Sequence, residues 1–394
     1  MLTSLSLIFL LGLLLGNIFN KLRLPNLLGM LITGIILGPY ALNLLDNTIL
    51  SISADLRELA LIIILIRAGL SLDINDLKKV GRPAILMCFV PACLEIFGMI
   101  IIAPKLLGIS ILDAAIMGAV VGAVSPAVIV PKMLHLMEAK CGTDKSIPQM
   151  IMAGASVDDV FVIVMFTAFT GLSQGELISP SSFLQIPISV VAGLLVGIIF
   201  GIVLSVCFEK IHIRDSMKVI ILLSVSFLFV AFEKISSVPF SGLLAVMSTG
   251  VSLYKKKPNV AQRLSSKFSK LWVGAEILLF VLVGATVDLS YAVSAGGAAV
   301  LVIFGALIFR MTGVFFCMIK TKLSMKEVLF CMIAYMPKAT VQAAIGSIPL
   351  TMGLPCGNIV LTVAVLAILI TAPLGAFGID ITYKRLLSRG NENV

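Results

Sequence analysis

Residues Gly154-Ala155-Ser156-Val157-Asp158-Asp159-Val160 lie in the middle of an apolar segment that runs from about Pro148 to Leu172. An ionised carboxylate at the centre of a bilayer costs about 2.5–3.5 kcal/mol on insertion scales. Two adjacent carboxylates are tolerated there only if a positive species, a proton or a metal ion, shares their site. The segment therefore predicts a membrane-spanning helix that carries a cation site.

The whole chain has the composition of a membrane protein. Of its 394 residues, 59% are hydrophobic and only 12% are charged, and the mean hydropathy is +1.14. Apolar stretches long enough to cross about 30 Å of hydrocarbon recur along it. We expect an all-α polytopic bundle of thirteen transmembrane helices, at residues 2–19, 27–43, 57–72, 82–103, 110–134, 147–172, 184–208, 217–233, 237–254, 271–288, 296–319, 327–350 and 357–383.

The basic residues predict the orientation of these helices. If the loops after odd-numbered helices and the C-terminal tail share one side, that side holds 23 of the 29 lysines and arginines. By the positive-inside rule, the C-terminus is then cytoplasmic and the N-terminus lies outside. Three basic residues, Arg67, Arg310 and Lys338, remain within the membrane spans. The net charge of +9 is thus a topology signal, and no nucleic-acid partner is expected.

The two halves of the chain resemble each other weakly. Residues Arg67–Asp73 (RAGLSLD) are echoed by Leu282–Asp288 (LVGATVD), at an offset of 215 residues, and two further segment pairs match in the same order. Equivalent helices are seven apart, so the second copy enters the membrane in the opposite sense. This predicts two inverted-topology repeats of six helices joined by a linker helix, an arrangement that places the ion site near the midplane.

Prolines interrupt two symmetry-related helices. Pro126 and Pro131 lie within residues 110–134, and Pro337 lies within residues 327–350. Proline removes a backbone donor and clashes with the preceding turn, and unwound backbone at membrane depth survives only where it is buried or lines a wet cavity. Two broken, crossing helices are therefore expected, with ordinary proline kinks as the alternative.

Four motifs together resemble the monovalent cation/proton antiporter superfamily. They are LPNLLGMLITGIILGP (24–39), GAVSPAV (122–128), GASVDDV (154–160) and PKATVQA (337–343). The last motif and RAGL (67–70) look most like the bacterial sodium/proton antiporters of the NHA branch.

The resemblance implies a homodimer in which a six-helix core moves against a dimerisation scaffold. Mapped onto this chain, residues 1–78 and 176–294 would form the scaffold with its linker helix. Residues 79–175 and 295–386 would form the ion-transporting core.

The aspartate pair is the expected ion site. Asp158 and Asp159 differ by about 100° around a helix, so they point into neighbouring parts of one cavity. Small, hard cations such as Na⁺ and Li⁺ prefer carboxylate, carbonyl and hydroxyl oxygens. In the pattern of the superfamily the second aspartate coordinates the ion, which implies binding by Asp159 with help from Asp158. Ser125, Ser156 and Thr340 are the expected supporting ligands.

Two buried bases are expected to serve this site. Lys338 is the predicted coupling base, because a desolvated lysine loses its proton readily, and its expected partner is Asp158. Arg310 is the alternative partner. Glu95 lies 215 residues before Arg310, so the two are approximate repeat equivalents, and a structural Glu95–Arg310 ion pair is expected near the axis that relates the repeats.

These features predict a secondary active antiporter, not an enzyme. It would exchange Na⁺ or Li⁺ for H⁺ across a cell (plasma) membrane, in the service of pH homeostasis, with no cofactor. Exchange of K⁺ for H⁺ and sodium-coupled symport of an organic solute by the same architecture are the alternatives. The number of protons per cation stays open, because it depends on whether Lys338 changes its protonation state.

Overall fold

A computed structural model describes residues 1–22, 24–71, 81–173, 180–211, 213–235, 240–287 and 289–388 of the chain. Within these ranges the secondary structure is helical, without a β-strand, and nine helices are long and apolar enough to cross a membrane. The prediction of an all-helical membrane protein is thus confirmed, whereas the count of thirteen stays a prediction. Asp73 and Asp288 of the repeat, and the predicted domain boundaries at 78 and 176, lie outside the described residues.

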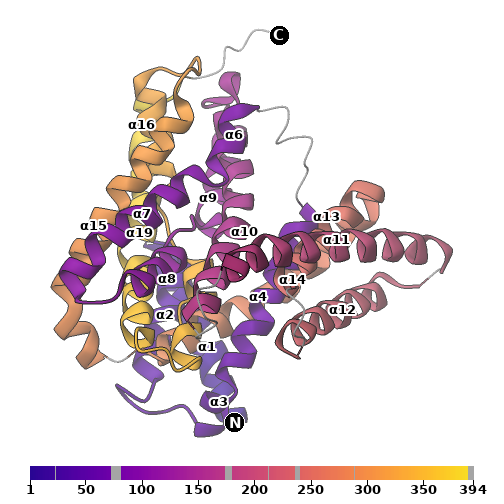
Figure 1. The fold of residues 1–394 in the computed structure, drawn as a ribbon, viewed down its shortest axis with the longest axis horizontal. Coiled ribbons are helices and arrows are strands. Elements are labelled where there is room, and N and C mark those ends of the chain that lie inside the picture. Colours follow the sequence, from indigo (N-terminus) through magenta and orange to yellow (C-terminus); the bar gives the residue numbers. More distant parts are fainter. Residues whose placement is uncertain are drawn as a thin grey trace. The chain divides into compact units, whose positions relative to one another are not determined.

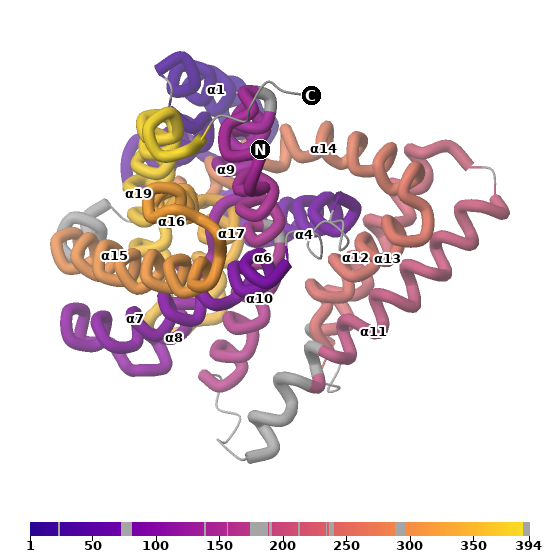
Figure 2. The backbone as a smooth tube through the Cα atoms, turned by 90° about the horizontal axis from the view of Figure 1, so that it is seen from above, coloured from indigo at the N-terminus to yellow at the C-terminus, as the bar shows by residue number. Residues whose placement is uncertain are grey.

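The helices form two compact units, which Figure 1 shows as ribbons. The larger unit comprises Met1–Ala54, Asn75–Thr170 and Phe280–Val394. Its helices are α1 (Leu2–Lys21), α2 (Asn26–Leu37), α3 (Asn47–Ser51), α6 (Arg82–Met87), α7 (Val90–Leu107), α8 (Ile111–Val121), α9 (Pro126–Glu138), the 3₁₀ turn Thr143–Lys145, α10 (Ile147–Ser173), α15 (Leu289–Met318), α16 (Met325–Ala334), α17 (Thr340–Ile345), α18 (Ile348–Thr351) and α19 (Gly357–Leu386). In both views α7 runs beside α15 (Figures 1 and 2), and α1 packs against α2.

The smaller unit comprises Asp55–Ile74 and Gly171–Leu279. It contains most of α4 (Ser53–Ser71) and α14 (Pro258–Ala285), together with α11 (Pro180–Lys210), α12 (Asp215–Ile235) and α13 (Gly242–Lys256). Helices α11 and α13 pack along their length, because small residues face each other. A Cβ added to Gly197 would lie 1.9 Å from Oγ of Ser248 and 2.4 Å from O of Ala245, the close backbone approach typical of membrane helix pairs.

Both predicted helix breaks are present in the larger unit. Helix α8 ends at Val121 and α9 begins at Pro126, whose missing N–H is no loss in a first helical turn. Helix α16 ends at Ala334 and α17 begins at Thr340, with Pro337 between them. The amide of Ser125 donates a hydrogen bond of 2.8 Å to the carbonyl of Pro337. The two unwound segments therefore touch each other directly.

Helix α19 supports the second break. Gly375 of this helix lies against the Pro337 ring so closely that an added Cβ would be 2.2 Å from its Cγ. One turn away, Oγ1 of Thr371 accepts a hydrogen bond of 2.9 Å from the backbone N–H of Lys338. The close approach that glycine permits and the threonine hydroxyl thus fix the unwound backbone from which the Lys338 side chain leaves.

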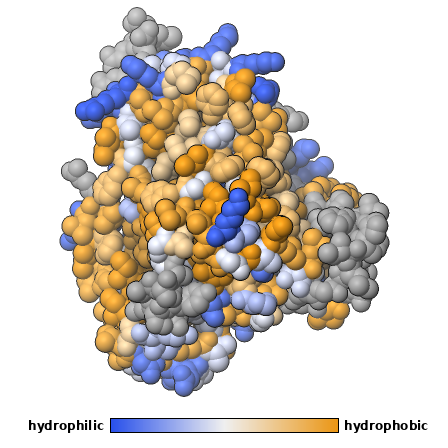
Figure 3. Space-filling view, turned by 60° about the vertical axis from the view of Figure 1, so that its left-hand side comes forward, coloured by the Kyte–Doolittle hydropathy of each residue, from blue (hydrophilic) through white to orange (hydrophobic). Residues whose placement is uncertain are grey.

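The surface of the molecule is suited to lipid. Figure 3 shows a mostly apolar face with hydrophilic residues at its top and bottom and a smaller hydrophilic group near its centre. Large apolar side chains are exposed on several of the long helices, among them Leu10 of α1, Ile199 of α11, Leu228 of α12 and Ile308 of α15. Such extensive apolar exposure is typical of a membrane interface.

Candidate cation-binding site

Helix α10 carries the aspartate pair past the first break. Asp158 is fully buried, with 0% of its side chain exposed. Its Oδ2 accepts a hydrogen bond of 2.9 Å from the amide of Val124, which lies in the unwound segment between α8 and α9. The break thus supplies a backbone donor that an intact helix would have used internally, and this donor fixes one carboxylate oxygen.

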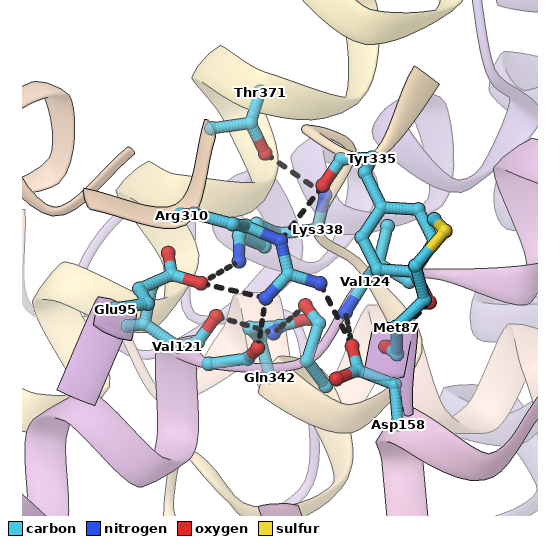
Figure 4. Close-up of polar contacts among 12 residues, drawn as sticks. Met87, Glu95, Val121, Val124, Asp158, Arg310, Tyr335, Lys338, Gln342 and Thr371 are labelled. Atoms are coloured by element: carbon cyan, nitrogen blue, oxygen red, sulfur yellow. Dashed lines mark hydrogen bonds and ion pairs between the residues drawn. The ribbon is translucent and has the colours of Figure 1, made fainter. Parts of the chain in front are cut away.

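Arg310 of α15 lies at the centre of the site (Figure 4). Its Nη2 donates to Oδ2 of Asp158 at 2.7 Å and its Nη1 to Oε2 of Glu95 at 2.8 Å. The guanidinium also donates to the carbonyls of Tyr335 (2.7 Å from Nε) and Gly122. A planar fork with five donors suits this task. Arg310 therefore ties α7, α10 and both breaks together.

The predicted Glu95–Arg310 ion pair is present in this geometry, but the expected contact of Lys338 with Asp158 is not. The Lys338 ammonium instead donates to Oε2 of Glu95 at 2.5 Å. The backbone N–H of Lys338 is held by Thr371 of α19, and from there the Lys338 side chain reaches Glu95 of α7, to which Arg310 also donates. One oxygen of Glu95 therefore serves two cations.

The charges of this site do not cancel. When all groups are ionised, the described residues of this site carry three negative charges, on Glu95, Asp158 and Asp159, and two positive charges, on Arg310 and Lys338. A buried net charge is unfavourable unless it is compensated. The cluster thus requires one more positive charge, which a proton or a monovalent cation can supply.

Asp159 follows Asp158 on α10 and is half-buried. Within the described part of the chain, several buried side-chain oxygens at the site and its two breaks lack a hydrogen-bond partner: Glu95 Oε1, Ser125 Oγ, Asp158 Oδ1, Asp159 Oδ1, Thr340 Oγ1 and Gln342 Oε1. Buried polar atoms normally have partners. Oxygens left in this state are the donor set that a hard cation prefers.

Three hydroxyl side chains were predicted to support the ion site. Ser125 precedes α9 at the first break, and Thr340 begins α17 after the second, and both are buried. The side chain of Ser156 lies outside the described part of the structure. The structure thus places two of the three predicted supporting residues at the paired breaks.

Two further residues with a role at the site were not singled out from the sequence. Nε2 of Gln342 donates to the carbonyls of Val121 (3.1 Å) and Ala123 (2.9 Å), so it binds the end of α8 and the unwound segment after it. The Tyr335 hydroxyl donates to the carbonyl of Met87 at 3.0 Å. The amide side chain of Gln342, in an otherwise mostly apolar α17, was the only sign in the sequence of such a role. Its partners are backbone carbonyls, which no sequence pattern reveals.

A model of the family described as "Sodium/hydrogen exchanger, transmembrane" matches residues 5–385. The chain therefore belongs to the sodium/hydrogen exchanger family, within the cation/proton antiporter superfamily that the motifs predicted. The similar sodium/hydrogen exchangers 9B2 and 9B1 come from eukaryotes, so membership of the bacterial NHA branch stays a prediction.

Individual relatives cover most of the chain. Sodium/hydrogen exchanger 9B2 of Xenopus tropicalis is 33% identical over 396 residues, which cover 95% of this chain and 72% of that protein. Human sodium/hydrogen exchanger 9B1 is 31% identical over 397 residues, covering 95% and 76%. The solved structure of the sodium proton antiporter MjNhaP1 from Methanocaldococcus jannaschii at pH 8 matches with a TM-score of 0.85, covering 98% of both chains. Because the sequence identity is only 20%, this structural match shows a shared fold and no more.

Proposed function

We propose that this protein is a secondary active antiporter that exchanges Na⁺ or Li⁺ for H⁺ by alternating access. The family supports exchange of a cation against a proton. The observation that carries the proposal is the buried cluster that needs one additional positive charge. A proton and an alkali cation can each supply that charge, and occupancy by one removes the need for the other. Competition of this kind is sufficient for antiport if only the occupied site crosses the membrane.

Asp159 is the proposed exchange group. Its Oδ1 has no partner within the described residues, whereas Oδ2 of Asp158 is already held by Arg310 and by an amide. Asp158 would contribute its unpartnered Oδ1 to the ion. Hydroxyls of Ser125, Ser156 and Thr340 would complete the coordination.

Lys338, predicted from the sequence as the coupling base, is proposed to be coupled to the ion site as a fixed cation, through Glu95 and not through direct contact with Asp158. The ammonium of Lys338 and the guanidinium of Arg310 share one oxygen of Glu95, so a change at Asp158 would reach Lys338 by way of Arg310. Because Glu95 already neutralises Lys338, we propose that Lys338 keeps its proton and that one H⁺ moves per cation. Release of a second proton from Lys338 would instead make the exchange electrogenic.

We propose for this function the architecture that the sequence predicts. Thirteen helices would form two inverted repeats, with a core (79–175 and 295–386) that moves against a dimerisation scaffold (1–78 and 176–294). The distribution of basic residues supports a cytoplasmic C-terminus and an external N-terminus in a cell membrane. Two copies would form a homodimer through their scaffolds.

The test is exchange by the purified protein in proteoliposomes that carry an imposed pH gradient. Addition of Na⁺ or Li⁺ should dissipate the gradient, and K⁺ added in parallel reports selectivity. Asp159→Ala should abolish this response while the purified protein keeps its melting temperature, because the coordinating charge is lost and the Arg310 contacts remain. Asp144→Ala, which removes an exposed loop carboxylate, is the matched control and should behave as wild type.

Two results would contradict the proposal at different levels. A wild-type protein that leaves the gradient intact with every cation, from neutral to alkaline pH, is not such an antiporter. Full exchange by Asp159→Ala would refute the assigned site and leave the antiport proposal standing.

A further inference from the structure

The larger unit contains a cavity of about 340 Å³ that lies between the end of α1, the start of α2, α9 and α19. Its wall includes the amide side chains Asn20 and Asn26 and one ion pair, Lys132 with Asp380. The other residues of its lining are uncharged. A water molecule takes about 30 Å³ of liquid volume, so the cavity has room for an alkali cation with its hydration shell.

The cavity runs along α9 from the helix break toward the basic end of the unit. Ala127 and Val128 line it in the first turn of α9, and Lys132 lines it about 7 Å further along the helix axis. Ala127 lies three residues after Val124, the amide donor to Asp158. Along the chain, the lining of the cavity therefore begins three residues after the amide that holds Asp158.

Its other end lies where the proposed topology puts the cytoplasm. Asn20 adjoins Lys21 at the end of α1, and Asp380 precedes Lys384 and Arg385 in the last turns of α19. These basic residues belong to the side that holds most of the lysines and arginines of the chain.

The ion pair is open to water. Lys132 donates to Oδ2 of Asp380, and their side chains are 28% and 38% exposed. Partly exposed pairs of this kind contribute little to stability, because water and salt screen them. The intact pair adds no net charge to the cavity. Loss of either partner would leave one unit charge there.

We infer that this cavity is the cytoplasmic vestibule for the alkali cation, in which Asp380 attracts the cation and Lys132 competes with it for the same carboxylate. The inference rests on the proposed function and adds to it a recruiting site outside the aspartate pair. A lysine ammonium and a hydrated Na⁺ are both monovalent cations, so each can neutralise Asp380. The strength of the Lys132–Asp380 pair then sets how readily the vestibule fills.

This assignment predicts opposite effects for the two single substitutions. Lys132→Gln leaves a free carboxylate, and Asp380→Asn leaves a free ammonium. A unit charge about 6 Å from the path of the cation changes its local concentration by about three-fold in water. Lys132→Gln should therefore lower the apparent KM for Na⁺ by about three-fold, and Asp380→Asn should raise it by about the same factor. The double variant, again neutral, should return close to wild type.

The experiment measures the KM for Na⁺ of proton exchange in everted membrane vesicles, where added salt meets the cytoplasmic face. The same variants in right-side-out vesicles should show wild-type KM values, because the vestibule faces the other side. Adding 0.3 M choline chloride should shrink the differences by screening. Lys140→Gln, which removes an exposed lysine from the same side of the protein outside the cavity, is the matched control and should leave KM unchanged.

The outcomes separate this inference from the proposed function. Exchange by wild type with identical KM values in all variants would overturn the vestibule assignment and leave antiport intact. Equal losses of maximal rate in both single variants would overturn it as well, because they would mean a structural tether between α9 and α19. A wild type without sodium-dependent proton movement would instead refute the antiport proposal itself.

Discussion

Neutralising Glu95 and Lys338 together should be less damaging than neutralising either alone. In Glu95→Gln, the buried Lys338 ammonium loses its carboxylate, and Arg310 keeps only Asp158. In Lys338→Met, Glu95 keeps only Arg310. Leaving one buried charge without its partner costs about 3–5 kcal/mol. We expect Glu95→Gln to lose stability on this scale. Lys338→Met should lose less, because Glu95 still contacts Arg310 and the cluster only gains one uncompensated negative charge.

The double variant restores the charge balance of the wild type. Arg310 still pairs with Asp158, Asp159 is still present, and the net charge of the cluster again calls for one cation. Replacing a buried ion pair by uncharged side chains is often close to neutral, so the coupling energy of the two substitutions should reach about 2–3 kcal/mol. The double variant should also exchange Na⁺ for H⁺, because in the proposed mechanism Lys338 does not give up its proton.

Stability is measured by reversible unfolding in mixed detergent micelles, and exchange in proteoliposomes with and without an imposed membrane potential. The matched control is the same pair of substitutions at Glu327 and Lys145, a pair with a 2.7 Å contact whose lysine is 38% exposed. Its coupling should stay below about 1 kcal/mol. A folded but inactive Glu95→Gln/Lys338→Met protein, or a wild-type rate that follows the membrane potential, would refute the reasoning and make Lys338 a proton carrier.

Gln342→Leu should lower the stability of the protein by about 1–3 kcal/mol for each carbonyl left without its donor, those of Val121 and Ala123. It should also raise the KM for Na⁺. An unchanged melting temperature and KM would count against the role of Gln342 at the break. Gly375→Ala should destabilise the protein by about 1–3 kcal/mol, because the new methyl group would overlap the Pro337 ring. Gly297→Ala, at a helical glycine with open space around it, is its control and should be neutral or stabilising in the same thermal melts. If one proton competes with one cation, the apparent KM for Na⁺ should rise by about tenfold for each unit by which the pH falls at the acidic end, and should level off at alkaline pH. The reason is that the ligand must be deprotonated to bind the cation. A hundredfold rise per pH unit would mean that two protons compete.

The sequence predicted the parts of the fold that depend on local chemistry. Pro126 and Pro337 cannot sit inside regular helices without loss of a backbone hydrogen bond, and the breaks lie where these prolines are. The pair of Glu95 and Arg310 could be predicted because the proposed repeat gives two opposite charges in apolar segments equivalent positions. Family membership also followed from the motifs.

The partner of Lys338 could not be predicted in the same way. Helix positions show which residues are buried, but they do not show which of two nearby carboxylates a long side chain reaches. The outcome depends on how Thr371 holds the backbone of Lys338, from which the side chain reaches Glu95. The contacts of Gln342 with backbone carbonyls depend in turn on where unwound segments pass, which is a tertiary property.

The hydrogen bond from Ser125 to Pro337 gives the protein a built-in reporter. Proline has no amide hydrogen, so the backbone hydrogen bond between these two residues carries a single exchangeable hydrogen, that of Ser125. Deuterium uptake at this one position would time the separation of the two segments during a transport cycle, without any label attached to the chain.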